Sequence, residues 1–407
     1  MATRYDLVIK GGEVIDPAQG VHGVLDVAFS GGRVAALDPA IPAAEARHTI
    51  DAAGKLVTPG LIDVHGHYFE HVVPWAIGAD EACLPNGVTT TVDAGSSGWT
   101  HFGAFREFIL SKERTRLMAL LNLSSLGMLN PLRPGGFGPT IGISGGPGYL
   151  LPHETAGELM DLRYAQVEET VQCIRDHPNV LLGVKIRLDH TISGTDNVIP
   201  ALERARKVAD ITDTFMMVHV ARVPVPMAKV FEYMKPGDII THVFHSAENN
   251  ILDAEGNVLP EVLEARDKGI IMDIGAAKPN IGIDISRAAI AQGFLPDTIS
   301  SDITKPVNDV GYIYNLPDVM SMYLGLGMSV EETITAVTLN PARAIDRESE
   351  LGTLRVGVVG DATVLDLEQG RFSYDDGDGK VLEASRRFRP VATVKDGAAW
   401  TPREPGE

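Results

Sequence analysis

The chain has 407 residues, of which 44% are apolar and 22% charged, and its formal net charge is −19. This composition suits a globular protein with one large core or two domains. The acidic excess argues against nucleic acid and anionic membranes as partners, so we expect a small-molecule substrate. With two cysteines, no leader-like start and no long apolar run, a cytoplasmic location is expected.

Both ends of the chain contain short alternating strands separated by Gly-rich turns. Residues 1–56 include the run YDLVIKGGEVID, and a similar pattern returns in residues 350–407 with LGTLRVGVVGDATVLDL. The simplest arrangement packs both ends together. We therefore predict a small β-sandwich domain built from residues 1–56 and 350–407, with residues 57–349 inserted between its two parts.

The middle of the chain alternates apolar strand-like runs with amphipathic stretches such as 156–177 and 198–213. This pattern is typical of βα units and a parallel sheet. The strand-like runs cover residues 61–67, 87–95, 116–125, 180–188, 215–221, 238–244, 270–275 and 297–303. Eight strands with intervening helices predict an α/β fold, a (β/α)8 TIM barrel over residues 57–349.

The connection at residues 126–152 is long, rich in Gly and Pro, and without periodicity. A structureless connection of that length in a compact domain is usually functional. We interpret it as a lid or binding loop, and a tolerated surface insertion is the alternative.

Polar residues gather at the ends of the predicted strands, where (β/α)8 barrels carry their catalytic groups. His65 and His67 are two residues apart, so they point to the same side of one strand. A single histidine at a strand end is usually a core residue, and a single aspartate there is often a helix cap. Four histidines and an aspartate at one barrel mouth instead indicate ligands for a divalent ion. Lys185 is unexpected among them, because an ammonium group would be repelled by a metal ion. The full set is His65, His67, Lys185, His219, His242 and Asp302.

The stretch GLIDVHGH (60–67) resembles the HxH opening of the amidohydrolase superfamily, and VTLNPARAI (337–345) resembles its closing signature. Further stretches, among them GVKIRL and LPDTISSDI, resemble its amidohydrolase/deacetylase branch of metal-dependent hydrolases, which is related to dihydroorotase and D-aminoacylase. The resemblance covers nearly the whole chain. It implies two divalent metal ions, with Zn²⁺ expected and Mn²⁺, Co²⁺ or Fe²⁺ also suited to these ligands.

The resemblance also implies a role for each predicted ligand. Lys185 matches a lysine that carries CO2 as a carbamate, an anion that bridges the two metals. The first ion would be held by His65, His67, Lys185 and Asp302, and the second by carbamylated Lys185, His219 and His242. A hydroxide bridging the metals would attack the substrate, and Asp302 would be the catalytic base that passes the proton to the leaving atom.

Three charged residues near the strand ends are expected to support this site. Arg187 shares a side with Lys185 and would bind a substrate carboxylate, or would instead form a salt bridge, for example to Asp63 or Asp93. Asp63 and Asp93 are expected behind the ligands, where they would orient histidines.

His245 and Lys278 are further predicted substrate contacts. Ala276 stands where relatives often carry a histidine after the seventh strand, so Lys278 or Asn280 would replace that polar contact. The substrate of relatives therefore does not transfer directly.

The leading hypothesis is a binuclear metal-dependent amidohydrolase that cleaves an amide or ester bond of a small N-acyl or O-acyl compound. A cyclic amidase of dihydroorotase or hydantoinase type is the alternative among enzymes. A non-catalytic barrel scaffold is the alternative of another class, and the retention of all the predicted ligands argues against it. We also expect a homo-oligomer.

Overall fold

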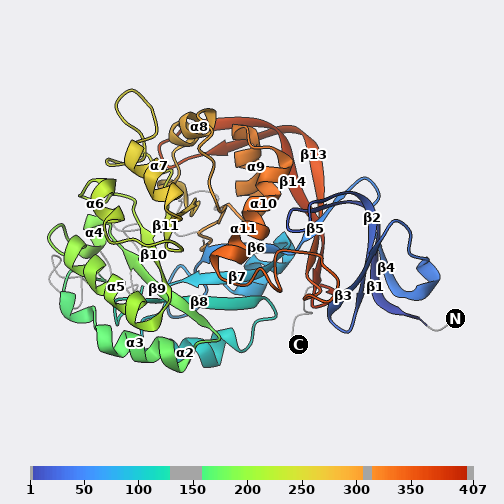
Figure 1. The fold of residues 1–407 in the computed structure, drawn as a ribbon, viewed down its shortest axis with the longest axis horizontal. Helices are drawn as coiled ribbons and strands as arrows, with labels where there is room; N and C mark the ends of the chain where they lie inside the picture. Colours follow the sequence, from blue (N-terminus) through green and yellow to red (C-terminus); the bar gives the residue numbers. More distant parts are fainter. Residues whose placement is uncertain (1–2, 129–157, 306–313, 401–407) are drawn as a thin grey trace, which may run out of the picture.

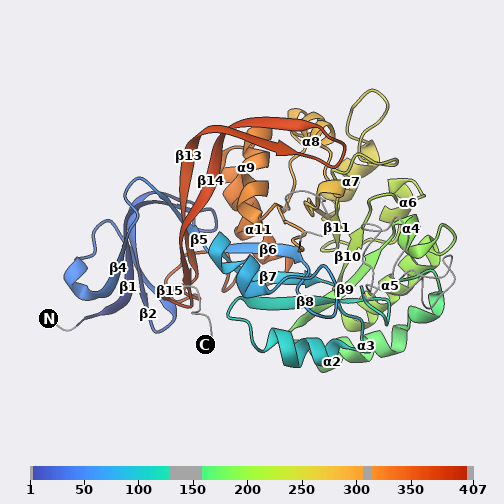
Figure 2. The ribbon, with the colours of Figure 1, turned by 180° about the vertical axis from the view of Figure 1, so that it is seen from behind.

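The computed structural model describes residues 3–128, 158–305 and 314–400. Its strands form two sheets, a sheet of eight strands and a parallel sheet of seven. Figures 1 and 2 show the two sheets side by side, with helices around the parallel one. Most of the loop predicted as a lid, residues 129–152, lies outside the described residues.

The eight-stranded sheet combines strands from both ends of the chain. Its strands are β1 (Tyr5–Asp16), β2 (Val21–Ser30), β3 (Arg33–Asp38), β4 (Ala46–Asp51), β5 (Leu56–Pro59), β13 (Ala362–Asp375), β14 (Val381–Lys395) and β15 (Ala398–Ala399). β5 links the two ends, because it pairs parallel with β1 and antiparallel with β13. Leu7, Val57, Leu354 and Val364 share one buried cluster. The predicted union of both ends is therefore present, as one continuous sheet, and its folding into a sandwich stays a prediction.

The second sheet is parallel and follows chain order. Its strands are β6 (Leu61–Gly66), β7 (Val88–Ala94), β8 (Arg116–Asn122), β9 (Leu181–Arg187), β10 (Phe215–His219), β11 (Ile239–Thr241) and β12 (Ile271–Asp273). Every residue of β6 and β7 is buried, as expected for parallel strands covered on both faces. The predicted parallel sheet is thus confirmed, and it curls as a barrel sheet does (Figure 1).

The predicted eighth strand, residues 297–303, lies between the two edge strands of this sheet. Isolated parallel bridges pair Thr298 with Asp273 of β12 and Ile303 with Gly66 of β6. The segment forms no regular strand, and near its end Asp302 has a φ of 49°, outside the extended region. It nevertheless connects both edges, since the Asp302 N–H donates to His65 O at 2.7 Å.

Helices connect most of the strands. They are α1 (Ala79–Ala82), α2 (Phe102–Phe105), α3 (Val167–Asp176), α4 (His190–Ser193), α5 (Val198–Thr212), α6 (Met227–Phe231), α7 (Pro260–Asp267), α8 (Ile283–Ala291), α9 (Leu316–Leu326), α10 (Val330–Val337) and α11 (Leu339–Ala344). α5 agrees with the amphipathic stretch at 198–213. α3 begins later than the stretch at 156–177, because Asp161 caps a separate 3-10 turn by accepting from Arg163 N.

The β13–β14 hairpin reaches from the eight-stranded sheet to the parallel one. Figures 1 and 2 show it crossing α9 toward α8. Phe388 N of β14 donates to Ser321 Oγ of α9 at 2.8 Å. A Cβ at Gly325 of α9 would lie 2.9 Å from Ala384 Cβ of β14, so the two elements are in close contact.

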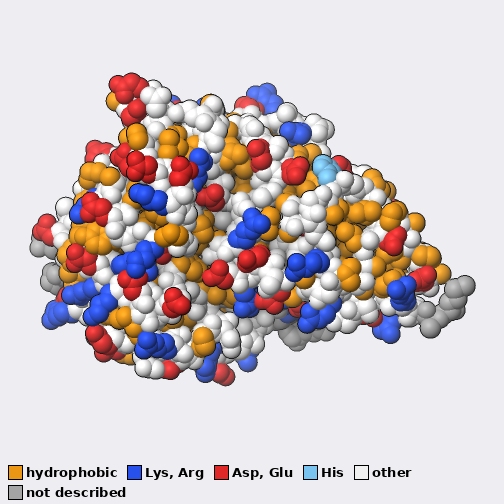
Figure 3. All heavy atoms as spheres, in the orientation of Figure 1, with side chains coloured by type: hydrophobic (Ala, Val, Ile, Leu, Met, Phe, Trp, Pro, Cys, Tyr) orange, Lys and Arg blue, Asp and Glu red, His pale blue; other side chains and the backbone are white. Residues whose placement is uncertain are grey.

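The surface carries charges of both signs. On the face drawn in Figure 3, Lys and Arg side chains alternate with Asp and Glu side chains. Among the helices of the described residues, none has both the length and the apolar character needed to cross a bilayer.

Candidate metal centre

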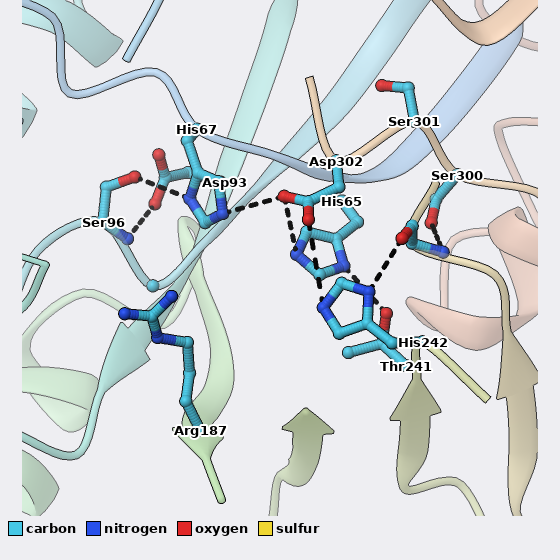
Figure 4. Close-up of polar contacts among 12 residues, drawn as sticks. His65, His67, Asp93, Ser96, Arg187, Thr241, His242, Ser300, Ser301 and Asp302 are labelled. Atoms are coloured by element: carbon cyan, nitrogen blue, oxygen red, sulfur yellow. Dashed lines mark hydrogen bonds and ion pairs between the residues drawn. The ribbon is translucent and has the colours of Figure 1, made fainter. Parts of the chain in front are cut away.

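The six predicted metal ligands are all buried and lie at or near the carboxyl ends of the parallel strands. They are His65 and His67 from β6 and the residues after it, Lys185 from β9, His219 from β10, His242 after β11, and Asp302 from the bridging segment. Figure 4 shows His65, His67 and His242 pointing toward Asp302. The structure therefore brings together residues that are up to 237 positions apart in the sequence (302 − 65).

Asp302 is the centre of the first group. Its Oδ1 lies 3.1 Å from His67 Nε2 and 3.4 Å from His65 Nε2, and its Oδ2 lies 3.9 Å from His242 Nε2. The candidate ligand atoms of His65, His67 and Asp302 all lie within 4.8 Å of one another. That spacing allows the three atoms to share one ion.

Lys185, His219 and His242 form a second, adjoining group. The ring centroids of His219 and His242 are 4.3 Å apart, and those of His65 and His242 are 5.0 Å apart. Lys185 Nζ lies 3.4 Å from His65 Nε2 and 3.2 Å from Met217 Sδ. His219 Nε2 is buried and has no hydrogen-bond partner among the described residues. A buried nitrogen of this kind is suited to a metal ion.

Two of these residues have left-handed backbone conformations. His242 has a φ of 66° and Asp302 a φ of 49°. Residues other than glycine rarely adopt this region, and such positions concentrate at functional sites. In both cases the turn follows directly after a strand-like segment and directs the side chain into the site.

Hydrogen bonds determine which nitrogen of two rings faces the site. Thr241 Oγ1 donates to Asp273 Oδ2 at 2.7 Å, so its oxygen accepts from His65 Nδ1 at 2.9 Å. His242 Nδ1 donates to Gly275 O at 2.7 Å. In both rings Nε2 is then left with its lone pair directed at the site, which is the form that binds a metal.

The predicted supporting carboxylates act mainly through the backbone. Asp93 accepts from Ser96 N at 2.7 Å, and Ser96 Oγ lies 3.1 Å from His67 Nδ1. Asp63 accepts from His65 N at 3.2 Å and from Ser301 N at 3.1 Å, so it ties β6 to the bridging segment. Burial raises the pKa of Asp63 to about 7.

Asp273 is a supporting residue that the sequence reasoning did not assign. It accepts from Thr241 Oγ1, from Thr298 Oγ1 at 2.7 Å and from Ser300 Oγ at 2.8 Å. Asp273 could have been assigned to the site from the sequence, because it lies at the carboxyl end of β12, as the predicted ligands lie at the ends of their strands.

Arg187 pairs with a carboxylate that was not expected. Its Nη2 and Nε contact Glu158, the latter at 3.2 Å, and Asn122 Nδ2 also donates to Glu158 at 3.2 Å. Arg187, Asn122 and Glu158 are all buried. The predicted alternatives, Asp63 and Asp93, make no such contact among the described residues. Glu158 could not be found from the sequence, because no strand pattern places it.

The two other predicted substrate contacts differ in their surroundings. His245 is buried, and neither of its ring nitrogens has a hydrogen-bond partner among the described residues. Lys278 Nζ lies 2.7 Å from Asp375 Oδ2, at the tip of the β13–β14 hairpin.

Burial controls the protonation of this site. It lowers the pKa of His65 to about 4 and the pKa of His219 and His242 well below the ordinary value, so these imidazoles are neutral. Burial opposes ionisation of Asp302, but the hydrogen bond with His67 helps to hold its pKa below the ordinary value. Burial also lowers the pKa of Lys185 to about 7. The site therefore offers neutral imidazoles and a carboxylate, the donor set of a divalent metal ion.

Comparisons with known proteins cover most of the chain. Residues 203–399 match the model of the amidohydrolase family. Deacetylase Atu3266 of Agrobacterium fabrum is 31% identical over 370 residues, which cover 91% of this chain and 85% of that protein. A deacetylase of Enterococcus faecalis is 27% identical over 97% of this chain and 99% of its own length.

Solved structures extend the likeness to the fold. The crystal structure of an adenine deaminase superposes with a TM-score of 0.85 and 27% identity, over 98% of this chain and 100% of that one. The crystal structure of a dihydroorotase has a TM-score of 0.82 and 28% identity, over 97% of this chain and 98% of its own. The chain therefore belongs to the amidohydrolase family and is a hydrolase of carbon–nitrogen bonds.

Proposed function

We propose that the chain is a binuclear metal-dependent amidohydrolase that removes an acyl group from a small N-acyl or O-acyl compound. The convergence of His65, His67 and Asp302 beside a buried lysine carries this proposal. The deacetylases of Agrobacterium fabrum and Enterococcus faecalis support an acyl group as the part of the substrate that is cleaved.

Two divalent ions fit the residues at the strand ends, and we propose Zn²⁺. The first would be held by His65, His67, Lys185 and Asp302, and the second by Lys185, His219 and His242. The unpartnered Nε2 of His219 and the Nε2 lone pairs of His65 and His242, which face the site, support this division. When bound, such ions would lower the pKa of a water molecule between them and polarise the substrate carbonyl.

Lys185 is proposed to carry CO2 as a carbamate. An ammonium group at this position would be repelled by the ions, whereas a carbamate is an anion with two ligand oxygens. The surroundings support the adduct, because burial favours the neutral amine, which is the form that adds CO2.

Asp302 is proposed as the base that takes a proton during attack and delivers it to the leaving nitrogen or oxygen. Its carboxylate is ionised and its Oδ1 lies 3.1 Å from His67 Nε2, at the centre of the ligand atoms. A residue with this position can transfer a proton without moving its backbone.

Arg187 and His245 are proposed to contact the substrate. Glu158 fixes the guanidinium of Arg187 in one orientation and offsets part of its charge. His245 has two ring nitrogens available to a bound molecule. Asp63 and Asp93 are proposed to support the ligands through the backbone and Ser96.

The experiment is a screen of the metal-loaded protein against acylated amino and hydroxy acids, both enantiomers of each, together with ring amides. We expect release of the acyl group from one linear class. Lys207→Ala, an exposed lysine paired with Glu168 at 3.7 Å, is the matched control for Lys185→Ala in the same screen. Less than one equivalent of metal per chain, with no turnover, would favour the scaffold instead.

A cyclic amidase is the second candidate, because the dihydroorotase structure superposes over nearly the whole chain. Ring opening of a dihydroorotate or hydantoin by the loaded protein, without release of acyl groups from linear compounds, would favour it.

The broader organisation is proposed as follows. A (β/α)8 barrel spans residues 57–349, and a β-sandwich domain is built from residues 1–56 and 350–407. A cytoplasmic location, a small-molecule substrate as the partner, and a homo-oligomeric assembly remain predictions from the sequence.

A further inference from the structure

The tip of the β13–β14 hairpin, residues 375–380, touches the loop that follows β12. Lys278 Nζ of this loop lies 2.7 Å from Asp375 Oδ2, and Lys278 O accepts from Gly377 N at 2.9 Å. Ile283 N, where the loop enters α8, donates to Asp376 Oδ2 at 3.1 Å. The fit is close, since a Cβ at Gly377 would lie 2.8 Å from Lys278 O. A domain built from the chain ends thus holds a loop at the barrel mouth.

The same tip also contacts the entrance to α9. Tyr314 Oη donates to Asp375 Oδ1 at 2.6 Å, and the Lys278 ammonium lies 5.4 Å from the centroid of the Tyr314 ring. Tyr314 is buried and Lys278 is largely so, with 12% of its side chain exposed. Lys278, Tyr314 and Asp375 therefore form one small polar cluster, which we call the latch.

The loop held by the latch supports the candidate metal centre at its other end. Gly275 O accepts from His242 Nδ1 at 2.7 Å, and Gly275 N donates to Ser300 Oγ at 3.0 Å. Ala276 N also donates to Ser300 O at 3.0 Å, two residues before Asp302. The loop between residues 274 and 282 thus contacts His242 on one side and the hairpin on the other.

We propose that Lys278 is a positioning residue, and that the latch fixes the loop which orients His242 and the segment of Asp302. The single positive charge of the Lys278 ammonium is already engaged, since it pairs with Asp375 Oδ2 at 2.7 Å and lies 5.4 Å from the centroid of the Tyr314 ring. This role differs from the substrate contact expected from the sequence. The expected changes in kcat and KM rest on the proposed function, whereas the expected changes in amide exchange do not.

The test is a double-mutant cycle of Lys278→Met and Asp375→Asn. Each single variant is expected to lower kcat by about tenfold with little change in KM. The double variant should be no worse than the poorer single one, because both residues act through the same latch. Lys278→Arg should recover most of the activity, since it keeps the ion pair. Arg371→Met is the matched control, because its partner Glu383, at 2.8 Å, belongs to the same hairpin.

Hydrogen exchange gives a readout that needs no substrate. In Asp375→Asn, amide exchange across residues 275–283 should accelerate, while the peptides of β7 and β8 keep their wild-type rates. Unchanged exchange in both latch variants would overturn the proposal. So would a raised KM in Lys278→Met alone, because that result marks a substrate contact. If the loaded wild-type protein hydrolyses no acyl compound, the proposed function fails, and exchange still decides the latch.

Discussion

The candidate metal centre has two halves, which differ in how many hydrogen-bond partners the protein itself provides. The first half is the group of His65, His67 and Asp302, and the second half is the group of Lys185, His219 and His242. In the first half, the Asp302 carboxylate faces two imidazole nitrogens at 3.1 and 3.4 Å. In the second half, His219 Nε2 has no hydrogen-bond partner among the described residues, and Lys185 Nζ has only a thioether sulfur and His65 Nε2 at hydrogen-bond distance there.

The difference indicates that the second half depends more strongly on what binds to it. A buried polar group without a partner costs free energy, whereas Asp302 has a hydrogen-bond partner in His67 Nε2 at 3.1 Å. We therefore expect the first half to retain its geometry without an ion. The polar groups of the second half should find partners only when the proposed carbamate and ion are bound.

The largest expected effect is on turnover through Asp302. Asp302→Asn should lower kcat by about 10³- to 10⁴-fold, because it removes the proton acceptor while keeping a ligand oxygen. Metal per chain should change little, as measured by atomic spectroscopy alongside kcat. Asp253→Asn, in an exposed turn, is the control. A kcat within tenfold of the wild-type value in a folded, metal-loaded variant would show that Asp302 is not the base.

Lys185→Ala should separate the two halves. Without the bridging group the second half should lose its ion, so bound metal should fall from two equivalents to about one, with an activity loss on the order of 10³-fold. A carbamate carbon resonance from ¹³C-bicarbonate should be present in the wild-type protein and in the Lys207→Ala control, and absent from Lys185→Ala. Retention of both ions and of the resonance would contradict the assignment.

Thr241→Val tests the orientation of His65 in the first half. The substitution removes the acceptor of His65 Nδ1 and leaves Asp273 with one donor fewer. Loss of such an orienting contact should weaken metal affinity by about 10- to 100-fold. Competition with a chromogenic chelator measures it. Wild-type affinity would show that the ring is held by packing alone.

Ser96→Ala should have the smallest effect of the series. Ser96 contacts His67 Nδ1 at 3.1 Å, and its own backbone remains tied to Asp93 after the substitution. We expect a loss of metal affinity of about tenfold, measured as for Thr241→Val. A loss larger than that of Thr241→Val would reverse the ranking of the two supports.

The strand-end residues were accessible from the sequence because their positions follow from local rules. Strand alternation places His65 and His67 on one side, and parallel strands bring the ends of β9, β10 and β11 to the same rim. These rules therefore selected His219 and His242 without knowledge of any contact. They also marked Asp273, although its three hydroxyl partners were not foreseen.

Contacts between loops were not accessible in this way. Glu158 lies in the amphipathic stretch 156–177 but before α3 begins at Val167, and no periodic pattern along the chain pairs it with Arg187 of β9. The sequence offers Lys278 only as a replacement for the histidine that relatives carry at the position of Ala276, and no local pattern places Asp375, almost a hundred residues away, against it.

The sequence by itself determined the order of βα units, the joining of both chain ends and the residues at the strand ends. These features depend on the periodic pattern of apolar residues and on the order of the strands and helices, and both can be read directly from the sequence. Only the tertiary structure decided the left-handed turns at His242 and Asp302, the tautomers of the histidines and the latch at the hairpin tip. These depend on the closure of the sheet and on the path of the hairpin, which bring distant backbone groups within hydrogen-bond distance.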